Sequence, residues 1–239
     1  MMNRKFWIII LLTAWNSLTY AAQVMPSRSF DKIHTPPAKP SHPITAVEIE
    51  YTVGNPSAPI IFYEYGSLTC HVCSNFYQNI LPKLLKDFPD IRVVVRLMSF
   101  DKLDMAAAKM ILHSKDPHEL SLAFYKTQNQ WMEASDQMDA LKRVALAFGM
   151  TEAEIETSLQ DKSLGQSLLS RRLILKAGSA PLFRLGKSLL PGLPDYEKYL
   201  KPMLERVVKH HKEGHDILEY DVLKEMSDEE KAKEKKEKL

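Results

Sequence analysis

The stretch IIFYEYGSLTCHVC, residues 60–73, decides the fold and contains both cysteines of the chain. Its first part is an apolar run of β-branched and aromatic residues that follows a turn-forming GNP at residues 54–56. Residues 60–65 are therefore predicted to form a buried strand. From Cys70 onward the spacing of apolar residues changes to four, which predicts a helix that ends near Asp87.

The residues after this helix complete a strand–helix–strand unit. Apolar residues alternate over residues 91–97, which predicts a second strand, and two strands joined in this way are expected to be parallel with a right-handed crossover. Helical periodicity then continues through most of residues 101–178. A short strand and a possible partner strand follow within residues 181–190, and an amphipathic helix is predicted over residues 196–207.

The two cysteines lie where the first strand passes into the first helix. Two intervening residues place both sulfurs on the first helical turn, near enough to form a bond. The free N–H groups and the positive end of the helix dipole favour a thiolate and lower the pKa of the first cysteine. Cys70 is therefore the candidate nucleophile, and Cys73 is the candidate buried residue that resolves a mixed disulfide. His71, when protonated, would stabilise the Cys70 thiolate further.

Three other interpretations of the cysteine pair remain open. A purely structural disulfide would close only a small loop and would constrain little of the unfolded chain. A zinc site would need two more ligands, and the nearest histidines, His113 and His118, do not have the matching spacing. Two coincidental buried thiols would be unusual as the only cysteines of an exported protein. The redox interpretation is favoured, and no metal site is predicted.

Two further residues support a redox site. Glu64 shares its strand face with Ile60 and Phe62, so its carboxyl is expected to point inward and to take the proton that Cys73 must lose. The alternative is a glutamate at the strand end turned to solvent. Pro181 opens the returning strand, where a proline marks either an edge or a cis peptide bond with Ala180 that exposes backbone groups to a substrate strand. An ordinary trans proline is the alternative.

These motifs resemble the DsbA family of exported thiol:disulfide oxidoreductases, and the match runs over about residues 60–204. The resemblance rests on Glu64-Tyr65 followed by Thr69-Cys70-His71-Val72-Cys73, on Phe76 and Leu81-Pro82, on residues 103–108, and on Ala180-Pro181-Leu182-Phe183 with Gly186 and Pro191-Gly192. It implies an α/β fold of the thioredoxin-like class with an inserted helical subdomain.

By this resemblance Cys70 is the nucleophile, Cys73 the resolving residue, Glu64 the buried acid and Pro181 the cis-proline. Val72, Ala180 and Pro181 are expected to contact substrates. The chain departs from the family in two places. The histidine stands one position early in His71-Val72, and Ala180 replaces the usual valine or threonine before the proline. Both positions adjust the redox potential and substrate release, so the resemblance predicts family membership more firmly than the direction of electron flow.

The ends of the chain predict export and a modular layout. Residues 1–22 have the order of a signal peptide, with Arg4 and Lys5 before an apolar stretch, although residues 6–22 could instead anchor the chain in the inner membrane. Residues 23–47 are a proline-rich arm or linker. The oxidoreductase domain is predicted over residues 48–212, and residues 213–239 are predicted to be a charged tail.

Composition limits the functions further. The chain has 239 residues, 32 Lys and Arg against 30 Asp and Glu, and 45% hydrophobic residues. This apolar fraction excludes global disorder, and the near-zero net charge argues against a dedicated nucleic-acid binder. His210, His211 and His215 are interpreted as surface histidines, with metal binding as the alternative.

The sequence therefore predicts a periplasmic, monomeric oxidase that transfers its Cys70–Cys73 disulfide to unfolded or newly exported proteins with cysteines, and that needs no cofactor. The resemblance also implies reoxidation by a membrane quinone-linked partner of the DsbB kind. A reductase or isomerase of the same fold and a redox-inactive chaperone on a thioredoxin scaffold are the alternatives.

Overall fold

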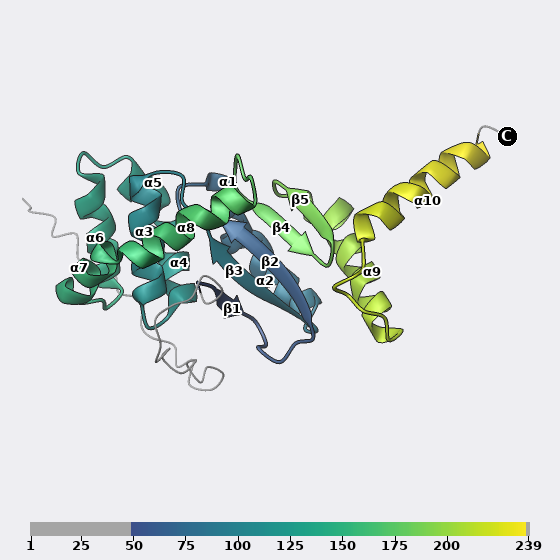
Figure 1. Ribbon diagram of the computed structural model, residues 1–239, viewed down its shortest axis with the longest axis horizontal. Coiled ribbons are helices and arrows are strands. Elements are labelled where there is room, and N and C mark those ends of the chain that lie inside the picture. Colours follow the sequence, from purple (N-terminus) through teal and green to yellow (C-terminus); the bar gives the residue numbers. More distant parts are fainter. Residues whose placement is uncertain (1–48, 238–239) are drawn as a thin grey trace, which may run out of the picture. The chain divides into compact units, whose positions relative to one another are not determined.

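The cysteine motif follows the central strand of a five-stranded sheet (Figure 1). In the computed structural model, which describes residues 49–237, strand β2 (Ile60–Gly66) pairs in parallel with β3 (Ile91–Leu97). The helical segment between them begins directly after Cys70. The predicted strand–helix–strand unit with parallel strands is therefore confirmed.

Three further strands extend this unit on both sides. Strand β1 (Tyr51–Val53) pairs antiparallel with β3, and β4 (Leu182–Leu185) pairs antiparallel with β2. Strand β5 (Ser188–Pro191) forms the hairpin with β4 that the sequence suggested, which gives the order β1-β3-β2-β4-β5. The hairpin turns at Gly186, whose φ of +57° and close approach to backbone oxygens leave no room for a side chain.

The helix after Cys70 contains one wide turn. It consists of α1 (His71–Asn75), the π-helical segment η1 (Phe76–Ile80) and α2 (Leu81–Asp87), where the spacing of apolar residues predicts one regular helix. The wide turn ends at Ile80, where the N–H of Leu81 bonds to the carbonyl of Phe76 five residues earlier. Pro82, which has no backbone N–H to donate, follows in the first turn of α2. The helix still ends at Asp87, as predicted.

A helical subdomain is inserted between β3 and β4. Five of its six helices, all but α5, begin after a polar residue whose side chain accepts a backbone hydrogen bond from the first turn, for example Asp101 before α3 and Thr151 before α7. In order they are α3 (Lys102–His113), α4 (Pro117–Lys126), α5 (Gln128–Met132), α6 (Gln137–Ala147), α7 (Glu152–Gln160) and α8 (Lys162–Ile174). These helices occupy residues 102–174, and the predicted insertion spans about residues 101–178.

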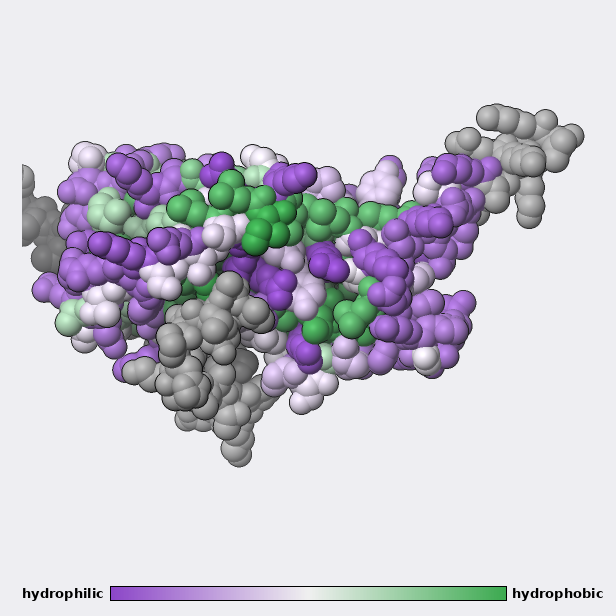
Figure 2. All heavy atoms as spheres, viewed as in Figure 1, coloured by the Kyte–Doolittle hydropathy of each residue, from purple (hydrophilic) through white to green (hydrophobic). Residues whose placement is uncertain are grey.

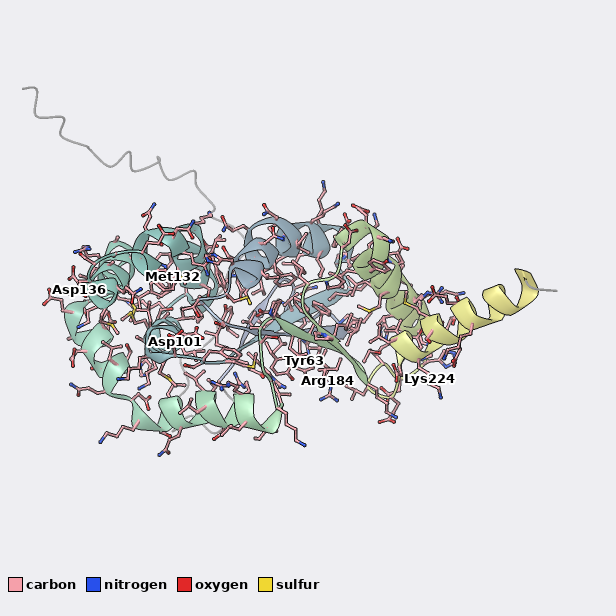
Figure 3. All side chains as sticks on the ribbon, turned by 90° about the horizontal axis from the view of Figure 1, so that it is seen from above. Tyr63, Asp101, Met132, Asp136, Arg184 and Lys224 are labelled. Carbon is pink, nitrogen blue, oxygen red and sulfur yellow. The ribbon has the colours of Figure 1, made fainter. Side chains whose placement is uncertain are left out.

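The sheet has helices on both faces (Figure 3). One face packs against α1–α2 and against η2 (Tyr196–Leu200) with α9 (Lys201–Lys212), and this packing buries the main apolar core. The other face is partly covered by α8 and by the residues after it. There a smaller apolar cluster forms from Tyr65, Met98 and Leu182, with Leu175 and Ala177 packed against it. Tyr63 and Arg184 lie on this second face.

The described fold continues past residue 212, where the sequence analysis places the start of the charged tail. Helix α10 (Val222–Glu237) begins with a fully buried valine, and the N–H of Lys187 donates to the carbonyl of Tyr220 at 2.9 Å. Arg206 on α9 forms ion pairs with two glutamates of α10. Residues 213–237 contain few apolar residues among many charged ones. The sequence therefore gives no indication that this segment packs on the β4–β5 hairpin.

The signal peptide predicted at residues 1–22 and the linker at residues 23–47 lie outside the described residues. Within residues 49–237, none of the helices is long and apolar enough to cross a membrane.

Candidate active site

Cys70 occupies the position just before the first turn of α1. Its backbone is extended, with φ −89° and ψ 115°, so its side chain lies over the helix end, and Sγ accepts the N–H of Cys73 at 3.2 Å. Serine, threonine, aspartate and asparagine usually cap a helix in this way. Here a sulfur replaces the oxygen, which directs the free N–H groups of the helix end at the group that must carry negative charge.

These contacts give Cys70 the acidity of a reactive thiol. The hydrogen bond from the Cys73 thiol lowers the pKa of Cys70 to about 7, against its ordinary value of 9.0 and against the opposing effect of partial burial. Backbone N–H groups of Cys73 and Val72 contribute in the same direction. Cys70 therefore forms a thiolate more readily near neutral pH than an ordinary cysteine does.

Cys73 has the opposite environment. It is fully buried, and burial raises its pKa well above the ordinary range. The hydrogen bond between its side chain and that of Cys70 raises the pKa further, as does the charge of Glu64. The pair thus combines one accessible, acidic thiol with one inaccessible, weakly acidic thiol.

Glu64 is a buried carboxyl at this site, as its strand position predicts. Its side chain is 0% exposed, and within the described residues neither carboxyl oxygen has a hydrogen-bond partner. Burial raises the pKa of Glu64 from 4.5 to about 8, and the charge of Cys70 adds to this shift. The carboxyl is therefore largely protonated at pH 7.

Gly66 makes the space that the Glu64 carboxyl occupies. It stands two residues further along β2 on the same face, and a Cβ atom there would lie 2.2 Å from Oε1 of Glu64. A real Cβ atom cannot come so close to an oxygen, so the glycine permits this rotamer. Gly66 was not among the predicted site residues, although a glycine inside a strand signals a close approach of this kind.

The loop before β4 brings Ala180 and Pro181 to Cys70. Sγ of Cys70 lies 3.3 Å from the carbonyl oxygen of Ala180, and the expected cis peptide bond joins Ala180 to Pro181. Residues 110 positions apart in the sequence therefore meet at the nucleophile. His71 and Val72 are exposed on the first turn, and Val72 is 45% exposed. Among the described residues, the His71 ring forms no hydrogen bond with either cysteine, and its effect on the thiolate remains a prediction.

The helical insertion holds the turn that precedes Cys70, a feature that the sequence analysis missed. The carboxylate of Asp104 on α3 accepts the N–H of Leu68 at 2.7 Å and the hydroxyl of Ser67 at 2.8 Å. From α4, the Tyr125 hydroxyl donates to the carbonyl of Ser67 at 3.2 Å, and from α5, Nε2 of Gln128 donates to the carbonyl of Leu68 at 2.7 Å. Three helices of the subdomain thus hold the turn that leads to Cys70.

An apolar band lies on one face of the described residues. Figure 2 shows it over α8 and toward the start of β4, and the α8 residues Leu169, Leu173 and Ile174 are 46%, 71% and 80% exposed.

The three histidines His210, His211 and His215 lie in and just after the last turn of α9. Within the described residues, no group of three or more His, Cys, Asp or Glu side chains is arranged to hold a metal ion.

Comparison with known proteins places this site in a wider context. Residues 47–172 match the family model described as "Thioredoxin". A curated protein of Rickettsia felis named "Putative protein-disulfide oxidoreductase" is 25% identical over 176 residues, which cover 66% of this chain and 63% of that protein. The chain therefore spans less than two thirds of the length of this relative.

Two solved structures have a similar fold. One is a variant of alpha-DsbA1 from Wolbachia pipientis, with a TM-score of 0.58 and 20% identity over 68% of this chain and 95% of that one. The other is described as a protein-disulfide isomerase from Novosphingobium aromaticivorans, with a TM-score of 0.56 and 22% identity over 66% of this chain and 96% of that one.

Proposed function

Because the chain belongs to the thioredoxin family, we propose that it is an exported thiol:disulfide oxidoreductase that introduces disulfide bonds into other proteins through Cys70 and Cys73. The observation that carries the proposal is the contrast between the two thiols. Cys70 is partly exposed with a pKa lowered to about 7, whereas Cys73 is buried with a raised pKa. A pair with one accessible, acidic sulfur suits thiol–disulfide exchange.

In the oxidising direction, a substrate thiolate attacks Sγ of Cys70 in the Cys70–Cys73 disulfide. The bond between the two cysteines breaks, a bond forms between the substrate sulfur and Cys70, and Cys73 leaves as a thiolate. A second substrate thiolate then attacks the first substrate sulfur, and Cys70 leaves. The substrate loses two electrons in forming its disulfide, and the cysteine pair gains them. The lowered pKa makes Cys70 a good leaving group in this last step.

The buried carboxyl of Glu64 serves the other cysteine. When Cys73 leaves as a thiolate, burial opposes its negative charge, so it must gain a proton quickly. Glu64 is protonated at pH 7 because its pKa is about 8, and its carboxyl supplies that proton. In the reverse direction the carboxylate takes the proton back. The side chain thus lowers the barrier for whichever direction the pair operates.

The proposed substrates are unfolded or newly exported proteins with free cysteines. The Ala180 carbonyl contacts Cys70 and Val72 is exposed on the first turn of α1, so these two residues and Pro181 would contact the substrate chain. The exposed apolar residues of α8 offer a surface for apolar segments. The signal-like residues 1–22 support a periplasmic location. We propose that a membrane quinone-linked oxidase of the DsbB kind restores the disulfide, and that the protein is monomeric.

The reduction potential of the cysteine pair tests the proposed direction. The protein would be equilibrated with mixtures of reduced and oxidised glutathione, and the reduced fraction would be measured by thiol alkylation. A potential near about −120 mV supports the oxidase, whereas a value of about −200 mV or lower favours a reductase or isomerase and overturns the direction. A pair that glutathione cannot reduce would overturn the redox function itself.

Two further measurements address the alternatives. A chaperone on this scaffold would keep its binding activity in the double variant Cys70→Ser/Cys73→Ser, whereas the oxidoreductase loses all disulfide transfer. N-terminal sequencing of protein from the periplasmic fraction would support signal cleavage if the chain starts after residue 22. Recovery of the uncleaved chain with the membrane would contradict it.

A further inference from the structure

A second buried carboxylate lies beside the turn that precedes Cys70, and no step of the proposed reaction uses it. Asp104 is 0% exposed in the first turn of α3. Its Oδ1 accepts the N–H of Leu68 at 2.7 Å, and its Oδ2 accepts the hydroxyl of Ser67 at 2.8 Å and the N–H of Phe100 at 3.1 Å. One side chain therefore joins the end of β3, the start of the insertion and the turn before Cys70.

These bonds fix the backbone that presents the nucleophile. The carbonyl of Ser67 accepts the N–H of Cys70 at 3.2 Å, so the turn bonded by Asp104 is the one that places Cys70 at the helix end. A carboxylate that accepts several hydrogen bonds in a buried place holds its donors more strongly than a neutral acceptor would. The orientation of Cys70 thus depends on a residue that lies 34 positions later in the sequence.

The same carboxylate also places a negative charge near the sulfur. Burial raises the pKa of Asp104 to about 6, while its three hydrogen bonds oppose this, so it is mostly ionised at pH 7. The hydrogen bond from Cys73 dominates the acidity of Cys70, and the charge of Asp104 acts against it by raising the pKa of Cys70. Within the described residues, Asp104 forms no ion pair with a basic side chain that would cancel its charge.

The titratable groups that interact with Asp104 are few. Asp101 caps the same helix and raises the pKa of Asp104. Cys70 precedes α1, and Tyr125 on α4 has its pKa raised mainly by burial, with the Asp104 charge as a smaller effect. Among these groups Cys70 is the one that gains and loses a negative charge in the proposed reaction.

We propose that Asp104 is a positioning residue for Cys70. It holds the Ser67–Leu68 turn in place, and its negative charge makes the Cys70 thiolate less stable. The inference rests on the proposed function, because the stability of the Cys70 thiolate matters only if Cys70 exchanges disulfides. It implies that the insertion limits how strongly oxidising the pair becomes, since a less stable thiolate makes the reduced form less favourable.

The first test compares Asp104→Asn with Asp101→Asn in the full chain. Both remove one carboxylate from the start of α3, but Asp101 is exposed and asparagine caps a helix as well as aspartate does. The readout is the midpoint of the pH profile of Cys70 alkylation in protein reduced with a phosphine. We expect the midpoint to shift downward in Asp104→Asn and to remain in place in Asp101→Asn. An unchanged or raised midpoint in Asp104→Asn would overturn the proposal.

A second measurement needs no variant and so remains decisive if Asp104→Asn does not fold. Coupling between two charges is reciprocal, so ionisation of Cys70, whose pKa is about 7, must act on Asp104 in the reduced protein, whereas the oxidised protein has no Cys70 thiol to ionise. The carboxyl carbon resonance of Asp104, followed from pH 4 to pH 9, should therefore show a second inflection near the Cys70 pKa in the reduced protein and none in the oxidised protein. Identical titration curves in the two redox states would refute the coupling.

The two proposals can fail separately. If glutathione exchanges with the pair but neither readout moves, only the role of Asp104 is wrong. If glutathione cannot reduce the pair, the proposed function fails, while the alkylation profile after phosphine reduction and the reciprocal effect on Asp104 can still be measured.

Discussion

Replacing Glu64 by glutamine should make the reduced protein more stable at alkaline pH and should make its disulfide exchange slower. The carboxyl is fully buried, has no hydrogen-bond partner among the described residues, and has its pKa raised from 4.5 to about 8, mainly by burial. An acid whose folded pKa lies above its unfolded pKa releases its proton more easily when the chain unfolds. It therefore destabilises the folded state increasingly as the pH rises from the unfolded to the folded pKa.

The size of this effect follows from the two pKa values. Each pKa unit corresponds to about 1.4 kcal/mol, so Glu64 lowers the free energy of unfolding by about 3 kcal/mol at pH 7 and by about 5 kcal/mol above pH 8. Below pH 4.5 the penalty disappears. Glutamine has no such titration, although burying its amide adds a cost of about 1–3 kcal/mol that is independent of pH. The stability difference between Glu64→Gln and the unaltered protein should therefore grow in favour of the variant from pH 4 to pH 9.

Urea unfolding of the fully reduced proteins at pH 4, 7 and 9 measures this difference. Glu119→Gln, which removes one exposed carboxylate from α4, controls for the loss of a negative charge. The same variants would be assayed for disulfide transfer to a reduced, unfolded protein, where Glu64→Gln should be slower by about 10²–10⁴-fold if the carboxyl carries the proton. A stability difference that stays flat between pH 4 and pH 9 would refute the buried, protonated state of Glu64.

Three further predictions follow from the site geometry. Cys73→Ser with Cys70 reduced should accumulate mixed disulfides when it is offered a protein disulfide, visible on non-reducing gels, because the Cys70 thiolate still attacks but no second cysteine remains to displace the bound protein; a variant that traps no more protein than the unaltered chain would argue against Cys70 as the attacking residue. Gly66→Ala should cost about 1–3 kcal/mol in urea unfolding, since its Cβ would displace the Glu64 carboxyl, and most of that cost should vanish in the Glu64→Ala background. Gln128→Ala should cost about 1–3 kcal/mol by leaving a buried carbonyl unpaired and should speed amide exchange in the turn before the cysteines, so unchanged exchange there would contradict the proposed support.

The sequence predicted those parts of the molecule that depend on local patterns. The strand of β2, the helix after it and the inward direction of Glu64 follow from alternation and period, because a strand buried on one face must place every second side chain in the core. The cysteine spacing at a helix start likewise indicates a reactive thiol without knowledge of the rest of the fold. The meeting of Cys70 with Ala180 came from the family resemblance instead of from either segment alone.

The parts that were missed depend on distant partners. Asp104 reads as an ordinary acidic residue in the first turn of a helix, where such residues are common. A weak signal was present, because Asp104 precedes the buried Ala107, Ala108 and Ile111 by three, four and seven residues and so lies on the apolar face. Gln128 carries no comparable signal, since a lone polar residue in a short helix does not reveal which carbonyl it bonds. The charged composition after residue 212 similarly hid the packing of Val222.

The hydrogen bonds between the insertion and the turn before Cys70 decide whether the insertion can be removed from this protein without effect on Cys70. The sheet and the helices packed on it outside the insertion resemble a minimal redox domain. A shortened protein could be made by removing the residues from the start of α3 to the end of α8. Such a trimmed protein would keep both cysteines and the capped helix, yet it would lose the side chains of Asp104, Tyr125 and Gln128 that hold the preceding backbone. The backbone before Cys70 would then be held by fewer hydrogen bonds and would be more mobile. If the proposed function is right, exchanging the helical subdomain between relatives should therefore change the reactivity of Cys70 as well as the fold.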